Sequence, residues 1–285
     1  MALLVRSAKK FTLLTAAAVL TAGLTACGTD SDPQKAGSGD QDEPLVVAAS
    51  PTPHAKILEF VRKNLADDAG LKLKIQEFTD YVQPNTATED GRVGANFFQH
   101  KPYLDDFNKK KGTHIVPVVN VELEPLGLYS NKVESTKDLT SGKTIALPND
   151  TTNEGRALLL LERAGLIRLK PGTGASGSLS DVQDRKGLKF KELEAAALPR
   201  SLDDVDASVI NGNYALEAKL NPSKDALAVE KAEKNPYANF LAVKRGQEKD
   251  PRVVKLARLL NSPEVRKYIN DTFKGGIVPV FGKVS

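Results

Sequence analysis

The segment Asn96-Phe97-Phe98-Gln99-His100-Lys101-Pro102-Tyr103-Leu104 concentrates residue types that are scarce elsewhere in the chain. Aromatic residues make up only 6% of the sequence, which has three histidines and no tryptophan. Core aromatics ending a strand would give part of this pattern. The polar groups directly beside them favour a pocket with apolar walls and a few fixed hydrogen bonds. Pro102 suits the first position of a helix, so the segment predicts a strand, a site and a helix start in succession.

Outward from this segment, apolar strand patterns alternate with helical ones. Residues 45–49 form a short apolar run, residues 54–69 have helical spacing, and residues 71–78 alternate like a strand. Another apolar run covers residues 113–121. Such alternation predicts an α/β layer with a mainly parallel sheet.

The same pattern begins again after residue 127, with a strand at 144–147. Thr151 and Glu154 have the spacing of a capping box, which would place Arg156 near a helix N-terminus. Free N–H groups and a guanidinium fork at such a position can bind a carboxylate. A surface arginine in a first helical turn is equally common, so Arg156 needs support from other residues.

The two α/β patterns predict two lobes joined by crossings near Pro125 and near Asn239. We expect residues 44–125 and 240–285 in lobe I and residues 126–239 in lobe II. This is the plan of a periplasmic-binding-protein-like fold, type II-like, with a hinge and a ligand cleft between the lobes.

The N-terminus has the features of an export signal. Arg6, Lys9 and Lys10 precede an apolar stretch of 14 residues, too short to span a bilayer. Leu24-Thr25-Ala26-Cys27 resembles a lipobox, which predicts signal cleavage after residue 26 and acylation, including palmitate, at Cys27. Residues 27–43 are polar and predict a flexible tether. We therefore expect a lipoprotein anchored to the extracytoplasmic face of the cell membrane.

Composition excludes several classes of protein. Removing the three signal cations lowers the net charge from +4 to +1, and no basic block mixed with aromatics remains, so nucleic acid is not an expected partner. A single cysteine allows no disulfide framework. No H-E-x-x-H, C-x-x-C or G-x-S-x-G motif occurs, and we expect no cofactor, no metal and no enzymatic activity.

Several blocks in one order resemble the methionine-binding lipoproteins of bacterial ABC importers, the NlpA/MetQ type. The resemblance runs from about residue 45 to residue 279. It is carried by residues 81–85, 98–104, 148–156, 198–204, 209–211 and 236–239.

This resemblance implies the residues of an amino-acid cleft and a function in methionine transport. The matching positions are Tyr81, Phe98, His100, Tyr103, Arg156, Asn211 and Asn239, with Phe97 and Asn153 added as neighbours. Arg156 would hold the ligand carboxylate, and the amide oxygens of Asn211 and Asn239 would accept from its ammonium group. Tyr81, Phe98 and Tyr103 would surround its side chain. The expected partners are L-methionine, D-methionine or a methionine-containing dipeptide, and an ABC permease with its ATPase; the expected oligomeric state is a monomer.

Two alternatives from other classes remain open at this point. His100 near Tyr81 and Arg156 is compatible with an enzyme on the same scaffold. A surface lipoprotein whose partner is another protein would also carry the lipid anchor.

Overall fold

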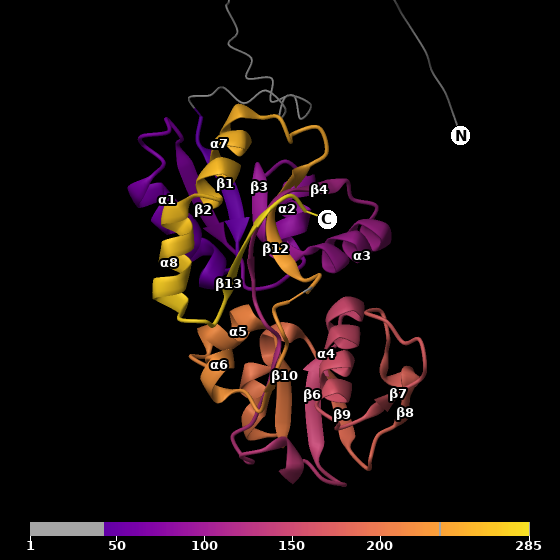
Figure 1. Ribbon diagram of the computed structural model, residues 1–285. Coiled ribbons are helices and arrows are strands. Elements are labelled where there is room, and N and C mark those ends of the chain that lie inside the picture. The colour runs from indigo at the N-terminus through magenta and orange to yellow at the C-terminus, as the bar shows by residue number, and fades with distance from the viewer. Residues whose placement is uncertain (1–42, 234, 285) are drawn as a thin grey trace, which may run out of the picture. The chain divides into compact units, whose positions relative to one another are not determined.

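The structure is a computed structural model that describes residues 43–233 and 235–284, all within one compact unit. The expected signal peptide, the acylated Cys27 and most of the expected tether lie outside the described residues. Within this unit the chain forms two α/β lobes, each built on its own sheet, and Figure 1 shows them joined by extended segments. In the described part of the chain, no helix is both long and apolar enough to cross a membrane.

Lobe I contains a six-stranded sheet in the order β13-β4-β12-β3-β1-β2. Its strands are β1 (Leu45–Ala49), β2 (Leu73–Glu77), β3 (Ala95–His100), β4 (Ile115–Leu123), β12 (Ala238–Lys244) and β13 (Val278–Gly282). Its helical segments are η2 (Pro51–Ala55), α1 (Lys56–Asn64), α2 (Gln83–Glu89), α3 (Lys101–Lys111), α7 (Pro251–Leu260) and α8 (Pro263–Phe273).

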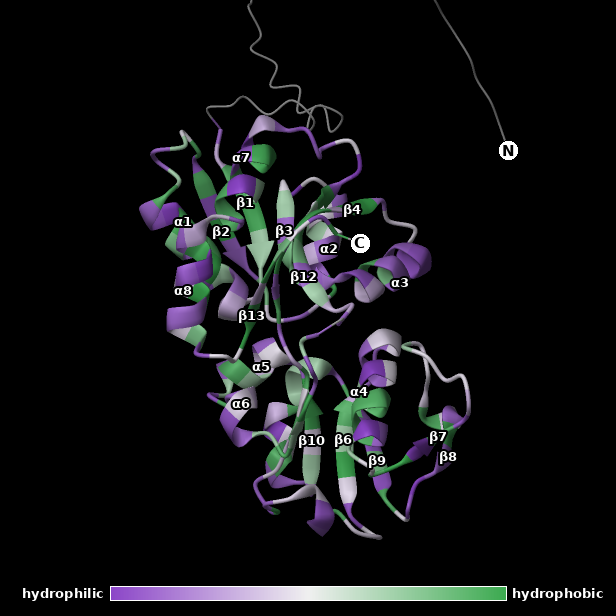
Figure 2. Ribbon diagram, viewed as in Figure 1, coloured by the Kyte–Doolittle hydropathy of each residue, from purple (hydrophilic) through white to green (hydrophobic). Residues whose placement is uncertain are grey.

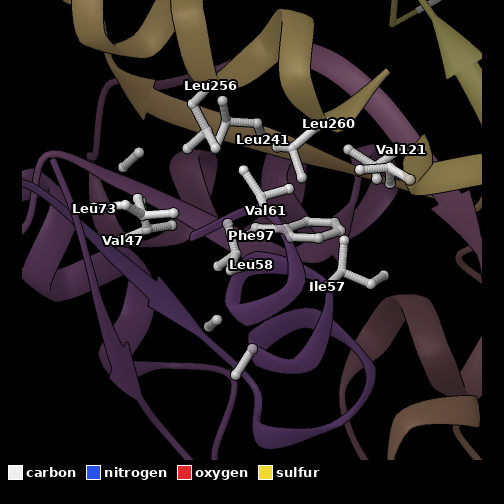
Figure 3. Packing of buried hydrophobic residues seen from close by; sticks show 14 of the residues in the cluster. Val47, Ile57, Leu58, Val61, Leu73, Phe97, Val121, Leu241, Leu256 and Leu260 are labelled. Atoms are coloured by element: carbon white, nitrogen blue, oxygen red, sulfur yellow. The ribbon is translucent and has the colours of Figure 1, made fainter. Parts of the chain in front are cut away.

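The main core of lobe I lies between this sheet and α1, α7 and α8. Ile57, Leu58 and Val61 follow helical spacing and place one face of α1 on the sheet, where all three are fully buried. Leu256 and Leu260 of α7 belong to the same hydrophobic cluster, and Figure 3 shows these side chains together. Burying each such side chain contributes about 1.5–3 kcal/mol, so this packing fixes the sheet that supports the site.

Lobe II contains a five-stranded sheet in the order β11-β5-β10-β6-β9 and a small β7-β8 pair. Figure 2 shows hydrophobic residues along β6 and β10, which are central in this sheet. The strands are β5 (Gly127–Tyr129), β6 (Thr144–Pro148), β7 (Arg168–Leu169), β8 (Val182–Asp184), β9 (Lys189–Leu193), β10 (Ala207–Ile210) and β11 (Ala228–Val229). The helical segments are η3 (Thr136–Asp138), α4 (Thr151–Arg163), η4 (Leu179–Asp181), η5 (Ala195–Ala197), η6 (Pro199–Asp203), α5 (Gly212–Glu217) and α6 (Pro222–Asp225).

Both sheets are mixed, so the expectation of a mainly parallel sheet is wrong. In lobe I, β1 pairs in parallel with β2 and β3, but β12 runs antiparallel to both β3 and β4. The reason is the second crossing, because the chain returns from lobe II after β11 and enters the sheet against the direction of its neighbours. The sequence patterns also missed α2, whose residues carry no apolar repeat of helical spacing.

Candidate functional site

A cavity between the lobes is lined by side chains from both of them. The space between these side chains, including its mouth, is about 320 Å³. Only about 20 Å³ of that space admits a water-sized sphere, about enough for one water molecule, so the side chains of the two lobes are closed on one another here. The lining residues are Tyr81, Phe98, Gln99, His100, Tyr103, Glu124, Asn153, Arg156, Asn211, Tyr237 and Asn239.

Three aromatic rings of lobe I form one wall of this cavity. The ring centroid of Tyr81 lies 6.0 Å from that of Phe98 and 5.7 Å from that of Tyr103, and the Phe98 and Tyr103 centroids are 6.1 Å apart. The Tyr103 hydroxyl donates to the Tyr81 carbonyl at 3.0 Å. These edge and tilted contacts are favourable aromatic geometries, so the wall is held by packing.

His100 connects the aromatic wall to lobe II. It is the N-cap of α3, and its Nδ1 accepts the backbone N–H of Tyr103 at 3.2 Å. In a neutral imidazole the other nitrogen then carries the hydrogen, so Nε2 donates to Asn153 Oδ1 at 3.1 Å. Burial, followed by the charge of Arg156, lowers the pKa of His100 to about 3. The imidazole is therefore a neutral hydrogen-bonding wall at neutral pH.

Asn153 fixes the orientation of a second asparagine, Asn211. The Asn153 amide nitrogen donates to both carboxylate oxygens of Asp150 at 3.0 Å, which turns its Oδ1 toward the cavity. That Oδ1 accepts from Asn211 Nδ2 at 2.9 Å as well as from His100. Asn211 Oδ1 is left buried and without a hydrogen-bond partner among the described residues. Buried amide oxygens normally accept a hydrogen bond, so this atom can accept one from a bound ligand.

The N-cap of α4 is Asp150, not Thr151 as the capping-box spacing suggested. Asp150 accepts from the backbone N–H of Asn153 at 3.0 Å, and Thr151 is already the first helical residue. Glu154 does not reach back to the cap and instead accepts from the backbone N–H of Leu179 at 2.7 Å. Asp150 is the better cap because its carboxylate also binds the Asn153 side chain.

Arg156 reaches the cavity from α4 and is paired with a carboxylate that sequence reasoning missed. Its Nη2 lies 2.6 Å from Glu230 Oε2, and its Nε lies 3.0 Å from Glu230 Oε1. Nη2 also donates to the Glu124 carbonyl at 2.8 Å, and the guanidinium lies 4.2 Å from the ring centroid of Tyr237. Burial raises the pKa of Glu230, but the charge of Arg156 and the hydrogen bonds from Arg156, Leu126 and Asn235 together hold it below its usual value. The guanidinium makes these hydrogen bonds through Nε and Nη2.

Asn239 and its neighbours close the cavity on the side of β12. Its Nδ2 donates to Glu122 Oε1 at 3.1 Å and lies 3.2 Å from His54 Nε2. His54, Glu122 and Glu124 bring one ring nitrogen or carboxylate oxygen each within 4.8 Å of one another.

The family model described as NlpA lipoprotein matches residues 45–281. The chain belongs to the NlpA lipoprotein family.

Members and structures similar to this NlpA-family chain carry names that refer to methionine or to transport. The D-methionine-binding lipoprotein MetQ of Escherichia coli is 40% identical over 259 residues, which cover 90% of this chain and 92% of the relative. A nutrient binding protein from Burkholderia cenocepacia, solved bound to methionine, is 46% identical with a TM-score of 0.80, covering 83% of this chain and 100% of that one. A periplasmic substrate-binding protein of an ABC transporter from Coxiella burnetii is 41% identical with a TM-score of 0.79, at 83% and 100% coverage. These matches confirm the predicted two-lobed α/β fold.

Phe97 is the one site residue expected from sequence that does not line the cavity of this NlpA-family protein. The pairing of β3 with β12 skips Phe98, an irregularity that turns Phe98 toward the cavity while Phe97 enters the core of lobe I. Figure 3 shows its ring among Leu58 and Val61, and it meets His54 edge-on with the ring centroids 4.6 Å apart. The other eight predicted residues all line the cavity.

Sequence reasoning missed three lining residues and one supporting residue. Gln99 lay inside the segment that predicted the site, and Tyr237 lay directly before Asn239, so proximity to a motif was a usable signal for both. Glu124 was interpreted only as part of a crossing. Glu230 follows β11 and has no motif, because its role depends on a contact 74 residues away in the chain.

Proposed function

We propose that this protein binds methionine between its lobes, as the L- or D-enantiomer or within a small dipeptide, and delivers it to an ABC permease. The observation that supports this most is the arrangement of a cation and an unpaired acceptor in the cavity. Arg156 lines the cavity with a cation, and Asn211 Oδ1 offers a buried acceptor. A zwitterion with a carboxylate at the cation and an ammonium group at the acceptor complements both.

The aromatic wall supports a thioether as the ligand side chain. Tyr81, Phe98 and Tyr103 present ring edges and faces around one space. A sulfur near ring edges gains about 0.3–1.5 kcal/mol, and an unbranched polarizable chain adapts to an irregular apolar pocket. The names of the relatives that refer to methionine agree with this chemistry.

The two-lobed construction supports delivery by hinge motion. Several hydrogen bonds already span the cleft, including His100 to Asn153, and Lys110 Nζ to Thr151 Oγ1 at 2.6 Å. A bound ligand adds further contacts across the same gap and holds the lobes together until the permease separates them. In this proposal the hinge comprises the two crossings, lobe I being residues 44–125 and 238–285 and lobe II residues 126–237, because Ala238 and Asn239 pair with β4 in the sheet of lobe I. The protein acts as a monomer anchored through Cys27 on the extracytoplasmic face.

The chemistry of the cavity supports binding without catalysis. With its low pKa, His100 carries no extra proton to donate at neutral pH and is only a weak base, and burial raises the pKa of Tyr81 well above its usual value. Neither group exchanges a proton readily under those conditions. The protein is therefore proposed to release its ligand chemically unchanged.

Isothermal titration calorimetry tests this function. The protein is unfolded, freed of small molecules by dialysis and refolded before titration with L-methionine, D-methionine, a glycine–methionine dipeptide and norleucine. We expect at least one methionine ligand to bind, and norleucine to bind about 0.3–1.5 kcal/mol more weakly than the matching methionine, because it lacks sulfur. No heat from either enantiomer or from the dipeptide would contradict the proposal. Mass spectrometry of the ligand after long incubation checks that it is unchanged.

A further inference from the structure

Three ionisable side chains form a buried cluster beside the cavity. His54 comes from η2, Glu122 from the end of β4, and Glu124 from the segment directly after it. The His54 Nε2 atom lies 3.2 Å from Glu122 Oε1 and 3.3 Å from Glu124 Oε1. All three residues are buried, with His54 and Glu122 fully so. Two carboxyl groups and an imidazole therefore share one small space shielded from water.

The cluster contains more charge than its surroundings compensate. Glu122 Oε2, Glu124 Oε1 and His54 Nδ1 have no hydrogen-bond partner in the described part of the chain. The permanent cation that acts on Glu122 and Glu124 is Arg156, which is already paired with Glu230. Two ionised carboxylates in such a place repel each other and lose their hydration, so the cluster is more stable when it carries a proton.

The directions of the pKa shifts agree with this geometry. Burial raises the pKa of Glu122 to about 8, and burial together with Glu122 raises the pKa of Glu124 to about 8. Burial lowers the pKa of His54 to about 4. Because the two carboxyl groups interact, they titrate as a pair. At neutral pH the ligand-free cluster therefore holds a proton on a carboxyl group rather than on the imidazole.

The cluster is connected to the ligand cavity at two residues. Glu124 lines the cavity itself, and its Oε2 accepts the backbone N–H of Asn213 from lobe II at 2.7 Å. Asn239 also lines the cavity and donates to Glu122 Oε1. A charge placed in the cavity thus acts directly on the proton of the cluster. The other charged or titratable groups around Glu124 are Arg156, Glu230, Tyr81, Tyr214, His100 and Asp150.

We propose that Glu124 is an acceptor for the ammonium group of the ligand and that binding expels one proton from the His54–Glu122–Glu124 cluster into solvent. This inference rests on the proposed function, since it requires a ligand with an ammonium group. A carboxylic acid becomes a carboxylate and a free proton, while the ligand ammonium keeps its own hydrogens. The new cation beside Glu124 stabilises the carboxylate and replaces the proton as the compensating charge.

A proton fits this cluster better than a metal ion does. One imidazole and two carboxylates are suitable metal ligands, and their spacing is compatible with a small ion. However, Asn239 Nδ2 donates to Glu122 Oε1 and lies 3.2 Å from His54 Nε2, so an N–H group already occupies the space beside these two atoms. In addition, His54 Nδ1 lacks the hydrogen-bond acceptor that a metal-bound imidazole usually has.

The test is calorimetry of the full chain with the methionine enantiomer that binds, at pH 7 in phosphate and in Tris, whose ionisation enthalpies differ. We expect about one proton to be released per ligand. Between pH 6 and pH 7.5 we expect the Kd to fall by up to tenfold per pH unit, because binding is linked to proton loss. Equal binding enthalpies in the two buffers, with tight binding retained, would overturn this inference and leave the proposed function intact. Absence of binding at every pH would overturn both.

Two variants and a chelator separate the cluster from other sources of protons. Glu124→Gln should abolish proton release and flatten the pH dependence of the Kd, and Glu122→Gln should reduce the release. The matched control is Glu154→Gln, another buried carboxyl group whose pKa is raised by burial but which does not line the cavity. Its proton release should equal that of the unaltered protein. Proton release that persists in Glu124→Gln would overturn the assignment of the proton to this cluster. Proton release that disappears when the unaltered protein is treated with EDTA would overturn it as well. The buffer comparison itself needs no variant.

Discussion

The two ends of the cavity are built by different physical means. The polar end, from lobe II, is positioned by directional bonds: Asp150 orients Asn153, Asn153 orients Asn211, and Glu230 holds Arg156. The aromatic end, from lobe I, is positioned by ring packing among Tyr81, Phe98 and Tyr103. Hydrogen-bonded groups tolerate little displacement, whereas packed rings can adjust. The polar end should therefore determine which class of ligand binds. The aromatic end should determine how the affinity varies with the ligand side chain within that class.

Replacing Arg156 should have the largest effect on both binding and stability. Arg156→Ala removes the guanidinium that binds the ligand carboxylate. It also leaves Glu230 as an uncompensated buried charge, which lowers the free energy of unfolding by about 3–5 kcal/mol. Urea unfolding measures this loss. Arg156→Ala combined with Glu230→Gln should regain much of the stability but not the affinity. Equal loss of stability in both variants would mean that the ion pair is not what holds Arg156.

The second prediction concerns the unpaired acceptor at the polar end. Asn211→Ala should weaken ligand binding by about 1.5–3 kcal/mol, because a hydrogen bond to a charged ammonium group is lost. Titration calorimetry measures the change. The control is Asn131→Ala, which removes an exposed asparagine that bonds only Asp203 and should bind normally. Unchanged affinity in Asn211→Ala would place the ammonium group elsewhere.

The third prediction tests His100, which lies where the two ends meet. Because its folded pKa of about 3 is below the usual 6.5, its contribution to stability is complete above pH 6.5 and is lost as the pH falls toward 3. At pH 5 the loss relative to pH 8 should be about 2 kcal/mol for this residue. His100→Gln should be less sensitive to acid in chemical unfolding, whereas replacement of the exposed His114 by Gln serves as the control. Identical acid sensitivity in all three proteins would contradict a neutral, buried His100.

The smallest effect is expected at the aromatic end. Phe98→Leu should weaken methionine binding by only about 0.5–1.5 kcal/mol, since aromatic contacts are lost but an apolar side chain remains. The ratio of methionine to norleucine affinity should fall as well, and calorimetry with both ligands measures it. Phe97→Leu is the neighbouring comparison, because Phe97 belongs to the core and should affect unfolding more than binding. A loss of affinity as large as that of Asn211→Ala would contradict the division between the two ends.

Local patterns in the sequence predicted the elements that carry the site, but not the contacts between distant segments. The strand-to-helix step at His100 and Pro102 and the helix bearing Arg156 follow from nearby residues, and the fold class follows from their alternation. The pairing of Arg156 with Glu230 and the cluster around His54 depend on how the second crossing returns to lobe I. The same limit explains the mixed sheet, because strand direction is decided by that return path. The side of the strand that Phe97 faces could not be predicted, because the pairing of β3 with β12 is irregular at Phe98 and depends on that same return path.

His100 caps the N-terminus of α3 and also bonds to Asn153 of lobe II. Its protonation is therefore linked to the separation of the lobes. Separating the lobes breaks the bond from Nε2 and admits water to the ring, so the imidazole regains an ordinary affinity for protons. At acidic pH, protonation of His100 would then favour the form with separated lobes. A low external pH would release the ligand even without the transporter.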